Sequence, residues 1–417
     1  MDYDICIIGA GIAGLYCARE LAKHMPDAKI CIMEKYKYIG GRTNTFKKII
    51  PGHGKVQWEA GAGRIHASHT QLLDLLKEYG IDIIPIHGGP QWREPGKQPV
   101  AVEFGSYIKN LNLKSIPEST LMKHTLNDVL EKVVGTTITR DMTSRYEYSS
   151  ELDTLRADKA LWALEHELGF HSNYFVVKGG FSSLVKALKQ DIEKRDVKIL
   201  REHEVSNIEL LKNNTYRVSV KSHISIHAGK VVVAIPRDDA VKLPCLRRLD
   251  IMDKVEMRPL VRMYAIFPLV NGKAWFHGIN SFVCAPPIRY TIPMNPKQGT
   301  IMISYTDGKD AEYWMKKNKN SGEAAIISEI MEQMRGLFPS LDIPDPIFFK
   351  IHEWSDGCSY WVPGAYDFDK VSKASVHPLP DTMPGLYMCN ESWAYNQCWV
   401  ECAIDQAKHA INSIMNV

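Results

Sequence analysis

A short apolar run near the N-terminus passes directly into a glycine-rich turn, and this feature constrains the fold of the 417-residue chain most. Asp4 to Ile8 is apolar enough for a buried strand, the turn is Gly9-Ala10-Gly11-Ile12-Ala13-Gly14, and helical spacing of apolar residues begins at Leu15. A second apolar run, Lys29 to Met33, ends at Glu34. Strand, turn, helix and strand in this order predict a βαβ unit.

The turn has the chemistry of a dinucleotide-binding site. Gly9 permits a tight turn, Gly11 lets the backbone approach a pyrophosphate, and Gly14 allows the helix to pack closely on the strand. The helix N-terminus offers free N–H groups and a positive dipole end to phosphates. Glu34, twenty residues after Gly14, stands where an acid bonds ribose hydroxyls. The alternative is a glycine-rich turn that holds no ligand.

A further glycine pair follows in Gly40-Gly41-Arg42-Thr43. Consecutive backbone N–H groups followed by an arginine suit a diphosphate, because both the nest and the cation bind anions. On its own, the same tripeptide is more often a surface turn. Its place shortly after Glu34 favours a diphosphate site.

The stretch from Ile5 through Gly14, with Glu34 and Gly40 to Thr43, resembles the flavin-containing amine oxidase family, which includes monoamine, polyamine and L-amino-acid oxidases. Further stretches resemble family motifs in the same order. They are Glu59 to Ala62, Gly179 to Phe181, Val205, Val231 to Pro236, Asn390-Glu391 and Cys398 to Ala403. Two glycines of the family's C-terminal motif are here Cys398 and Cys402, so the backbone at that end is less permissive than in the family's motif.

The resemblance implies an α/β fold (α+β overall), with a Rossmann-like FAD-binding domain of the glutathione-reductase type. This domain would be interleaved with a substrate domain made of a mixed sheet and helices. Because the matched motifs are far apart in the chain, we expect both domains to be discontinuous. The predicted ranges are 1–84, 176–245 and 365–417 for the FAD-binding domain, and 85–175 and 246–364 for the substrate domain.

FAD is the cofactor that the resemblance implies. Two electrons would pass from a C–H bond next to an amine to the flavin and then to molecular oxygen, giving an imine and hydrogen peroxide. The expected partners are therefore oxygen and a small amine or amino acid. The residues expected to contact FAD are Gly9, Gly11, Ala13, Gly14, Glu34, Lys35, Gly41, Arg42, Gly61, Ala62, Val205, Glu391, Trp399 and Val400.

Two arginines bear on the substrate. Arg64, in Glu59-Ala60-Gly61-Ala62-Gly63-Arg64, resembles the arginine with which L-amino-acid oxidases clamp the substrate carboxylate, a bidentate role. Ile65-His66 preserves part of the polyamine oxidase pattern, and Arg64 contacting flavin or a surface acid is a further alternative. Arg262 stands where the family usually has a lysine near the flavin. Unlike lysine, an arginine cannot readily release a proton. The alternative is that Arg262 only forms an ordinary salt bridge.

The segment from His352 to Gly364 is rich in aromatic residues. The resemblance implies that Tyr360 or Trp361 presents a ring before the flavin, where it orients the amine; core packing or a lid is the alternative. Cys358 lies near the position at which monoamine oxidases attach FAD through a cysteine sulfur. The local spacing is shorter here, so a free thiol is the main expectation.

Composition and charge exclude several other classes of protein. Lys plus Arg number 51 and Asp plus Glu 48, a net charge of +3 that gives no electrostatic case for nucleic acid or an anionic membrane. No apolar segment reaches membrane-spanning length, and the N-terminus does not resemble a signal peptide. Nine scattered cysteines indicate reduced thiols, and we expect a cytoplasmic location. No metal is expected, because His66, His69, His166 and His171 lack carboxylates at ligand spacing.

The preferred hypothesis is an amine oxidase, with an amino-acid substrate slightly favoured over a polyamine or monoamine. A desaturase or porphyrinogen oxidase shares the FAD motifs, but the polar second domain disfavours the large hydrophobic cavity that it needs. A non-enzymatic escort protein with this fold would have lost the cofactor, which the intact Glu34, Gly41 and Arg42 disfavour. The sequence gives no basis for the oligomeric state.

Overall fold

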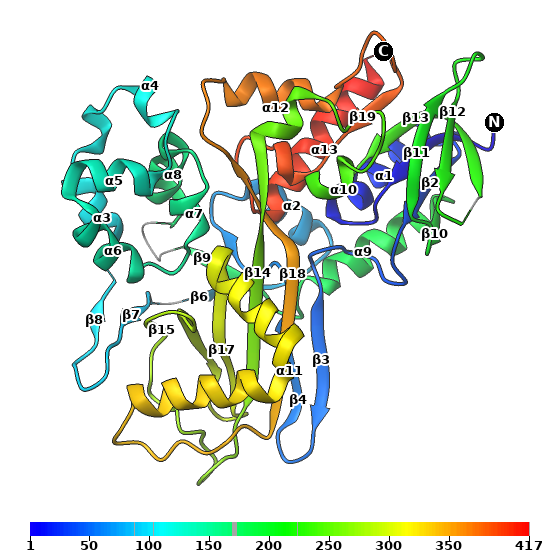
Figure 1. Ribbon diagram of the computed structural model, residues 1–417. Helices are drawn as coiled ribbons and strands as arrows, with labels where there is room; N and C mark the ends of the chain where they lie inside the picture. The colour runs from blue at the N-terminus through cyan, green and yellow to red at the C-terminus, as the bar shows by residue number, and fades with distance from the viewer. Residues whose placement is uncertain (87, 103, 169–172, 223, 417) are drawn as a thin grey trace.

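The computed structural model describes residues 1–86, 88–102, 104–168, 173–222 and 224–416. Figure 1 shows two groups of strands, with short helices gathered at the end of the molecule opposite the N-terminus. Strands and helices are mixed along the whole chain, and the predicted α/β class is confirmed.

The first sheet has the strand order β10-β2-β1-β13-β12-β11, with β19 beside β13. Strands β10, β2, β1, β13 and β19 run parallel, and Cys6 is in register with Cys31 and Val231. All five residues of β2 are buried, as expected for a continuous apolar run in a sheet covered on both faces. The bounds are β1 Tyr3–Ile8, β2 Ile30–Glu34, β10 Lys198–Arg201, β11 Val205–Leu210, β12 Tyr216–Val220, β13 Ser225–Val233 and β19 Leu386–Met388.

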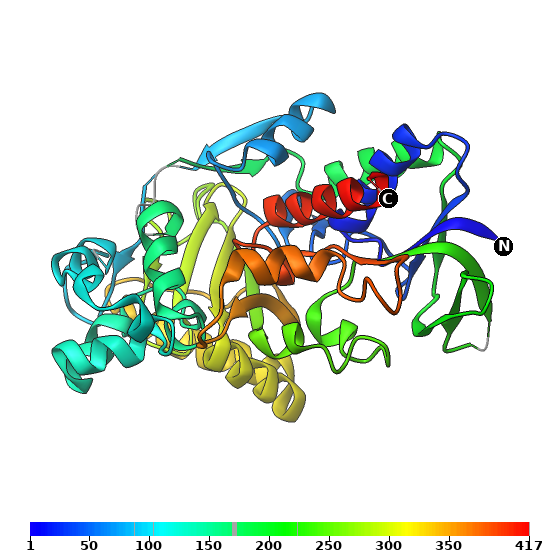
Figure 2. The same ribbon diagram turned by 90° about the horizontal axis from the view of Figure 1, so that it is seen from above.

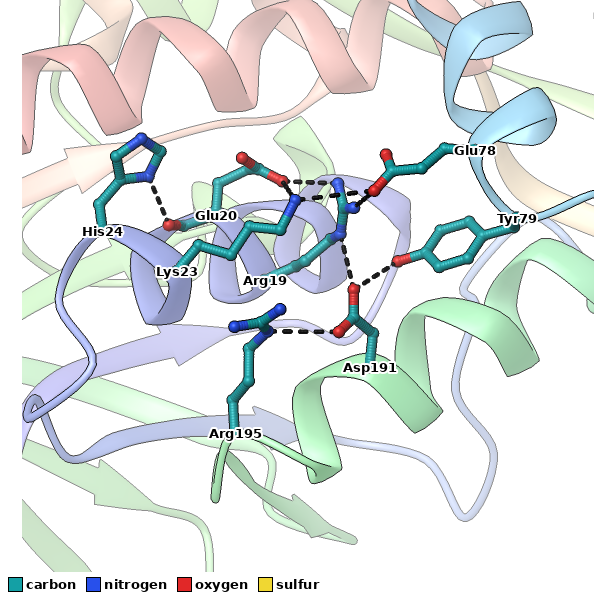
Figure 3. A network of polar contacts seen from close by, with 8 residues as sticks. All are labelled: Arg19, Glu20, Lys23, His24, Glu78, Tyr79, Asp191 and Arg195. Carbon is teal, nitrogen blue, oxygen red and sulfur yellow. Dashed lines mark hydrogen bonds and ion pairs between the residues drawn. The ribbon is translucent and has the colours of Figure 1, made fainter.

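Helix α1 (Ile12–His24) packs against α9 (Ser182–Glu193) and α13 (Val400–Met415), and α13 also contacts α2 (Thr70–Glu78). The buried Arg19 of α1 ties three of these helices together (Figure 3). Its guanidinium pairs with Asp191 of α9 at 2.9 Å and with Glu78 of α2. Two short helices, α10 (Arg237–Ala240) and α12 (Phe368–Val376), lie near the same sheet (Figures 1 and 2).

The second sheet has the order β18-β14-β17-β16-β15-β7-β8. Helix α11 (Gly308–Leu337) packs on β14 and bends at Gly322, whose φ is 76°. The bounds are β7 Gln91–Trp92, β8 Val100–Ala101, β14 Val255–Ile266, β15 Phe282–Val283, β16 Tyr290–Asn295, β17 Thr300–Asp307 and β18 Phe348–Trp361. Beside these lie the hairpin β3 (Thr45–Ile50) and β4 (Gly54–Glu59), and the small sheet of β5 (Ile65–His66), β9 (Tyr174–Val177) and β6 (Ile83–Ile86).

The group of short helices comprises α3 Phe104–Asn110, α4 Glu118–Leu121, α5 Leu126–Val134, α6 Thr136–Ser144, α7 Ser150–Asp153 and α8 Ala157–Ala163, with a π-helical turn at Leu164–Leu168. The helical pattern from Ser149 to Leu168 predicts one helix there, and that prediction is wrong. The carboxylate of Asp307 accepts the N–H groups of Ser149 and Ser150 and begins α7. Arg156 then adopts extended backbone and donates its N–H to the carbonyl of Trp361, which separates α7 from α8.

The strands of the first sheet fall within 1–84, 176–245 and 365–417, and those of the second within 85–175 and 246–364. Each sheet is therefore assembled from separated stretches of the chain. This arrangement is what two interleaved domains require, and the stated boundaries stay a prediction.

Candidate active site

The turn after β1 is built as the three glycines predict. The φ of Gly9 is 103°, and a Cβ on Gly9 would meet the carbonyl oxygen of Ala234 at 2.6 Å. A Cβ on Gly14 would lie 2.0 Å from the carbonyl oxygen of Gly9, so only glycine lets α1 approach the strand. A Cβ on Gly11 would meet nothing within 4 Å, and no side chain caps α1 there. The first N–H groups of α1 are thus left for a ligand in the open space beside Gly11.

The end of β2 places a buried carboxylate next to this turn. Glu34 is 6% exposed and accepts the N–H groups of Ala10 at 2.8 Å and Tyr36 at 2.9 Å. Burial raises the pKa of Glu34, and these hydrogen bonds partly offset the effect. Each carboxylate oxygen retains a second lone pair, so the group can still accept from a ligand hydroxyl.

The C-terminal motif meets the front of the chain through an ion pair. The guanidinium of Arg42 lies 2.5 Å from the carboxylate of Glu391 and donates to the carbonyl of Gly357 at 3.0 Å. Glu391 also accepts from the hydroxyl of Ser359 at 2.9 Å and from the N–H of Cys398 at 3.2 Å. Burial opposes charge on Arg42, but the carboxylate of Glu391 outweighs it, so the pKa of Arg42 is raised.

These elements surround one cavity of ≈ 710 Å³. It is lined by most of the residues that the sequence predicts to contact FAD: Gly9, Gly11, Ala13, Glu34, Lys35, Gly41, Arg42, Gly61, Ala62, Val205, Glu391, Trp399 and Val400. Gly14 is absent from this lining, because its part in the turn is to let α1 pack closely. Trp399 immediately precedes α13, and its indole N–H donates to Glu167 at 3.0 Å.

Arg64 and Arg262 both line the cavity, and burial does not neutralise either one. Arg64 donates to the hydroxyl of Tyr148, and its guanidinium lies 5.4 Å from the ring centre of Tyr148 and 5.1 Å from that of Tyr174. Burial opposes charge on Arg64, but nearby phenol groups outweigh it and the pKa is raised. Within the part of the chain that the structure describes, Arg64 has no carboxylate at ion-pair distance.

Arg262 lies on β14, where it is in register with Tyr305 of β17 and His352 of β18. Its guanidinium is 4.5 Å from the ring centre of Tyr305 and donates to the carbonyl of Glu59 at 3.4 Å. A Cβ on Gly63 would come within 2.8 Å of this guanidinium, so glycine there makes room for the arginine. The neighbouring phenols outweigh burial and raise the pKa of Arg262.

The two aromatic candidates on β18 have different surroundings. Tyr360 lines the cavity, whereas Trp361 is fully buried and packs against Tyr366 and Phe368. The indole N–H of Trp361 donates to the carbonyl of Ala394 at 3.1 Å. Successive strand residues point to opposite faces of a sheet, so the two rings cannot share one role. The placement of Trp361 does not fit the predicted ring before the flavin, and Tyr360 is the member of the pair that fits.

Several cavity residues were not anticipated from the sequence. The segment from Tyr148 to Glu167 contributes one wall, and Asp307 another. Glu151 has a buried carboxylate oxygen without a hydrogen-bond partner, and burial raises its pKa, with Asp307 adding to the effect. Burial also lowers the pKa of Lys159 to about 7, while its ammonium donates to Asn396 at 2.7 Å. The helical spacing of this segment carried no signal that these side chains meet a cavity.

No group of three or more His, Cys, Asp or Glu side chains is arranged to hold a metal ion in the described residues, and His171 falls outside them. The described helices include none that is long and apolar enough to cross a membrane. All nine cysteines are free thiols.

Comparison with known proteins identifies the family of the chain. A family model described as flavin containing amine oxidoreductase matches residues 12–415. The chain belongs to this family. It is therefore an FAD-dependent oxidoreductase, and the open space at Gly11, the acceptor at Glu34 and the partly buried cation at Arg42 fit the cofactor.

Amine oxidase [flavin-containing] A of Equus caballus is 22% identical to the chain, over 99% of the chain and 85% of the horse protein. Prenylcysteine oxidase 1 of Rattus norvegicus is 36% identical over 108 residues, a match that spans 26% of this chain and only 20% of the rat protein. Among solved structures, cyclohexylamine oxidase from Brevibacterium oxydans IH-35A has a TM-score of 0.75 at 17% identity. That match covers 100% of this chain and 99% of the oxidase, and it shows the shared fold.

Proposed function

We propose that the protein oxidises the C–H bond next to an amino group, giving an imine and passing the electrons to molecular oxygen as hydrogen peroxide, and that amino acids are its preferred substrates. Bound FAD supplies the two-electron acceptor. Membership of the flavin-containing amine oxidoreductase family supports the reaction class. The substrate preference rests on Arg64.

The observation that carries this preference is the position of Arg64, which interacts with the carboxyl groups of Glu147 and Glu151 only at longer range. The guanidinium is held against tyrosine rings inside the cavity and, among the described residues, has no carboxylate partner at ion-pair distance. A carboxylate entering the cavity would complete a charge-assisted pair with it. Because such a pair fixes orientation, it would hold the α-carbon of an amino acid in one place.

The remaining roles follow from position. The FAD-contacting residues named above would bind the cofactor, with Glu34 on the ribose and Arg42 near the diphosphate. Tyr360 would present its ring to the amine, and Arg262 would hold a water or a second anionic group, because it does not give up its proton. Glu151 offers an acceptor for the substrate amine through its unpartnered oxygen.

A polyamine or monoamine substrate is the second candidate, and the acids on the cavity wall favour it. Glu151, Glu167 and Asp307 all line the cavity and would suit the several cationic groups of a polyamine, whereas a monoamine would need only one of them. A desaturase or porphyrinogen oxidase fits less well, because charged side chains at Arg64, Arg262 and Lys159 interrupt any wholly apolar surface.

The test is peroxide release from the purified holoenzyme over matched panels of amino acids, their decarboxylated amines and polyamines. We expect peroxide with at least one amino acid and a lower kcat/KM for the matching amine. Faster turnover of polyamines would overturn the amino-acid preference. If no substrate releases peroxide while the flavin is still reduced under nitrogen, oxygen is not the acceptor, and a desaturase is favoured.

A further inference from the structure

Two cysteine thiols meet on the cavity wall. Cys358 lies on β18 and Cys398 immediately precedes Trp399 at the start of α13, and both line the cavity. The thiol of Cys398 donates to the carbonyl of Ser359, the residue after Cys358, at 3.1 Å, and its pKa is raised in part by the neighbouring Cys358 thiol. The two thiols are therefore neighbours on one wall, and a disulfide between them requires Cα atoms within about 4.4–6.8 Å of each other.

Two other pairs of neighbouring cysteines differ from Cys358 and Cys398 in that they do not reach the cavity. Cys6 is in register with Cys31, and Cys389 raises the pKa of the neighbouring Cys17 thiol, but all four are at most 1% exposed and lie outside the cavity lining. They behave as small apolar core residues. Of the nine cysteines, Cys358 and Cys398 are the ones that a solute in the cavity would meet.

The backbone at Cys398 also sets this position apart. Its φ is 71°, in the left-handed region that favours glycine, so a side chain is kept here at a conformational cost. The N–H of the same residue donates to Glu391, which pairs with Arg42. Any movement of Cys398 is therefore transmitted to the ion pair at the proposed cofactor site.

The chemical environments of the Cys358 and Cys398 thiols differ. Burial raises the pKa of the Cys398 thiol, and its hydrogen bond with Cys358 adds to the effect, so Cys398 remains protonated. The guanidinium of Arg42 donates to the carbonyl of Gly357, directly before Cys358. The same guanidinium also interacts electrostatically with the Cys358 side chain, so of the two sulfurs Cys358 is the one beside a cation.

We propose that Cys358 and Cys398 form a peroxide-sensitive dithiol that closes to a disulfide on the cavity wall. The Cys358 sulfur attacks one oxygen of hydrogen peroxide, the O–O bond breaks, and a sulfenic acid and one water result. The Cys398 sulfur then displaces the sulfenic oxygen, which leaves as a second water with the thiol proton. Two thiols and one peroxide thus give one disulfide and two waters, and a dithiol reductant reverses the change.

The source of the peroxide rests on the proposed function, since that reaction releases peroxide inside the same cavity. The thiol chemistry itself is independent of turnover and can be tested with added peroxide. A disulfide removes the Cys398 donor from Ser359 and shifts the residue that holds Glu391. We therefore expect disulfide formation to shift the visible absorption spectrum of the bound flavin.

The experiment uses the FAD-loaded protein, treated with hydrogen peroxide in the absence of any amine, then denatured, alkylated with N-ethylmaleimide and mapped by mass spectrometry. We expect two of the nine thiols to be lost, one peptide pair linked through Cys358 and Cys398, and a shift of the visible flavin spectrum. Dithiothreitol should reverse all three changes. Cys358→Ser should keep its remaining thiols, whereas Cys398→Gly should form no link and should stop at the Cys358 sulfenic acid. Cys398→Gly also removes the left-handed side chain, which favours folding.

Cys245→Ser is the matched control, because Cys245 is partly exposed but outside the cavity lining, and this variant should still form the link. Retention of all nine thiols, a link between other cysteines, or thiol loss that persists in Cys358→Ser would overturn the proposal. A link formed with added peroxide, together with no peroxide released from any amine, would contradict the proposed function but support the dithiol.

Discussion

The guanidinium of Arg42 lies 2.5 Å from the carboxylate of Glu391, and this ion pair joins the glycine-rich front of the chain to its C-terminal motif. The side chain of Glu391 is 7% exposed and accepts two further hydrogen bonds, from Ser359 and Cys398. Removal of one partner from a buried pair leaves an uncompensated charge. The pair therefore couples two motifs that are distant in sequence but line the same cavity.

Replacing the arginine of this pair should weaken FAD binding. For Arg42→Ala we expect the Kd for FAD to rise about 10- to 100-fold, because hydrogen bonds to a charged group contribute about 1.5–3 kcal/mol. Titration of FAD against the apoprotein, followed by flavin fluorescence, measures the change. Arg145→Ala, which removes an exposed pair with Asp141, should bind FAD normally. An unchanged Kd with a lower melting temperature would make Arg42 a purely structural residue.

Arg64 should discriminate between an amino acid and its decarboxylated amine. In Arg64→Met we expect kcat/KM for the amino acid to fall about 30- to 100-fold, because about 2–3 kcal/mol of charge-assisted bonding is lost. Turnover of the matching amine should change less than threefold or so, since no carboxylate is involved. Steady-state peroxide assays measure both values. Equal losses for the two substrates would instead show that Arg64 supports the tyrosines beside it.

The βαβ front of the site could be predicted because its requirements are local. Gly9, Gly14 and Glu34 have their roles fixed by neighbours within one supersecondary unit, and spacing in the sequence reports those roles directly. The order of the later motifs similarly indicated which distant stretches would converge. Family membership and the placement of most predicted residues on one cavity agree with that reasoning.

The substrate end could not be predicted to the same degree, because tertiary contacts decide it. The break between α7 and α8 depends on Arg156, whose guanidinium donates to the carbonyls of Gly364 and Tyr366. Helical spacing alone does not reveal such partners. The direction of Trp361 depends on the register of β18, which the aromatic run does not specify. The spacing of apolar residues predicts a helix from Ser321 to Met334, whereas α11 begins at Gly308. Its lysine-rich first half buries only Gly308, Ala311 and Trp314, so its helical pattern is weak.

Glu59 should make stability depend on pH near neutrality. Burial raises the pKa of Glu59 to about 7, although hydrogen bonds from Phe181 and Thr45 oppose the shift. The ordinary value is about 4.3. Between these values the folded state holds a proton that the unfolded state has lost, so stability should fall as pH rises through this range and stay lower above pH 7 or so.

Glu59→Gln should abolish this slope and raise the free energy of unfolding by about 2–3 kcal/mol at pH 8 or so, with little gain below pH 4 or so. Gln keeps an oxygen to accept from Phe181. Urea unfolding at several pH values measures the change. The exposed Glu193 provides the control, since Glu193→Gln should alter stability by less than about 0.5 kcal/mol at every pH. A Glu59→Gln protein that is less stable at high pH would show that the ionised carboxylate is favourable.

Two arginines pair with the carboxylate of Asp191, and we expect the buried one to contribute more to the free energy of unfolding than the exposed one. Asp191 pairs with Arg19, whose side chain is 3% exposed, at 2.9 Å and with Arg195, which is 36% exposed, at 3.2 Å (Figure 3). We expect Arg19→Met to lower the free energy of unfolding by about 2–3 kcal/mol. This loss is smaller than the roughly 3–5 kcal/mol for a fully buried pair, because water can reach the carboxylates that lose their partner. Arg195→Ala should cost less than about 0.5 kcal/mol.

The stabilisation that the Arg19–Asp191 pair provides should also depend on pH. It should be lost as pH falls, whereas the stabilisation linked to Glu59 is lost as pH rises. Burial opposes charge on Asp191, but hydrogen bonds from Arg19 and Tyr79 outweigh it and lower the pKa of Asp191 below its ordinary value of about 3.9. Its stabilisation is therefore complete above that value and is lost as pH falls through the lower folded-state pKa. In urea unfolding, the difference between the wild type and Arg19→Met should be constant above pH 5 or so and shrink toward pH 3 or so. Equal losses from Arg19→Met and Arg195→Ala, or a difference that grows in acid, would contradict the role of burial in this network.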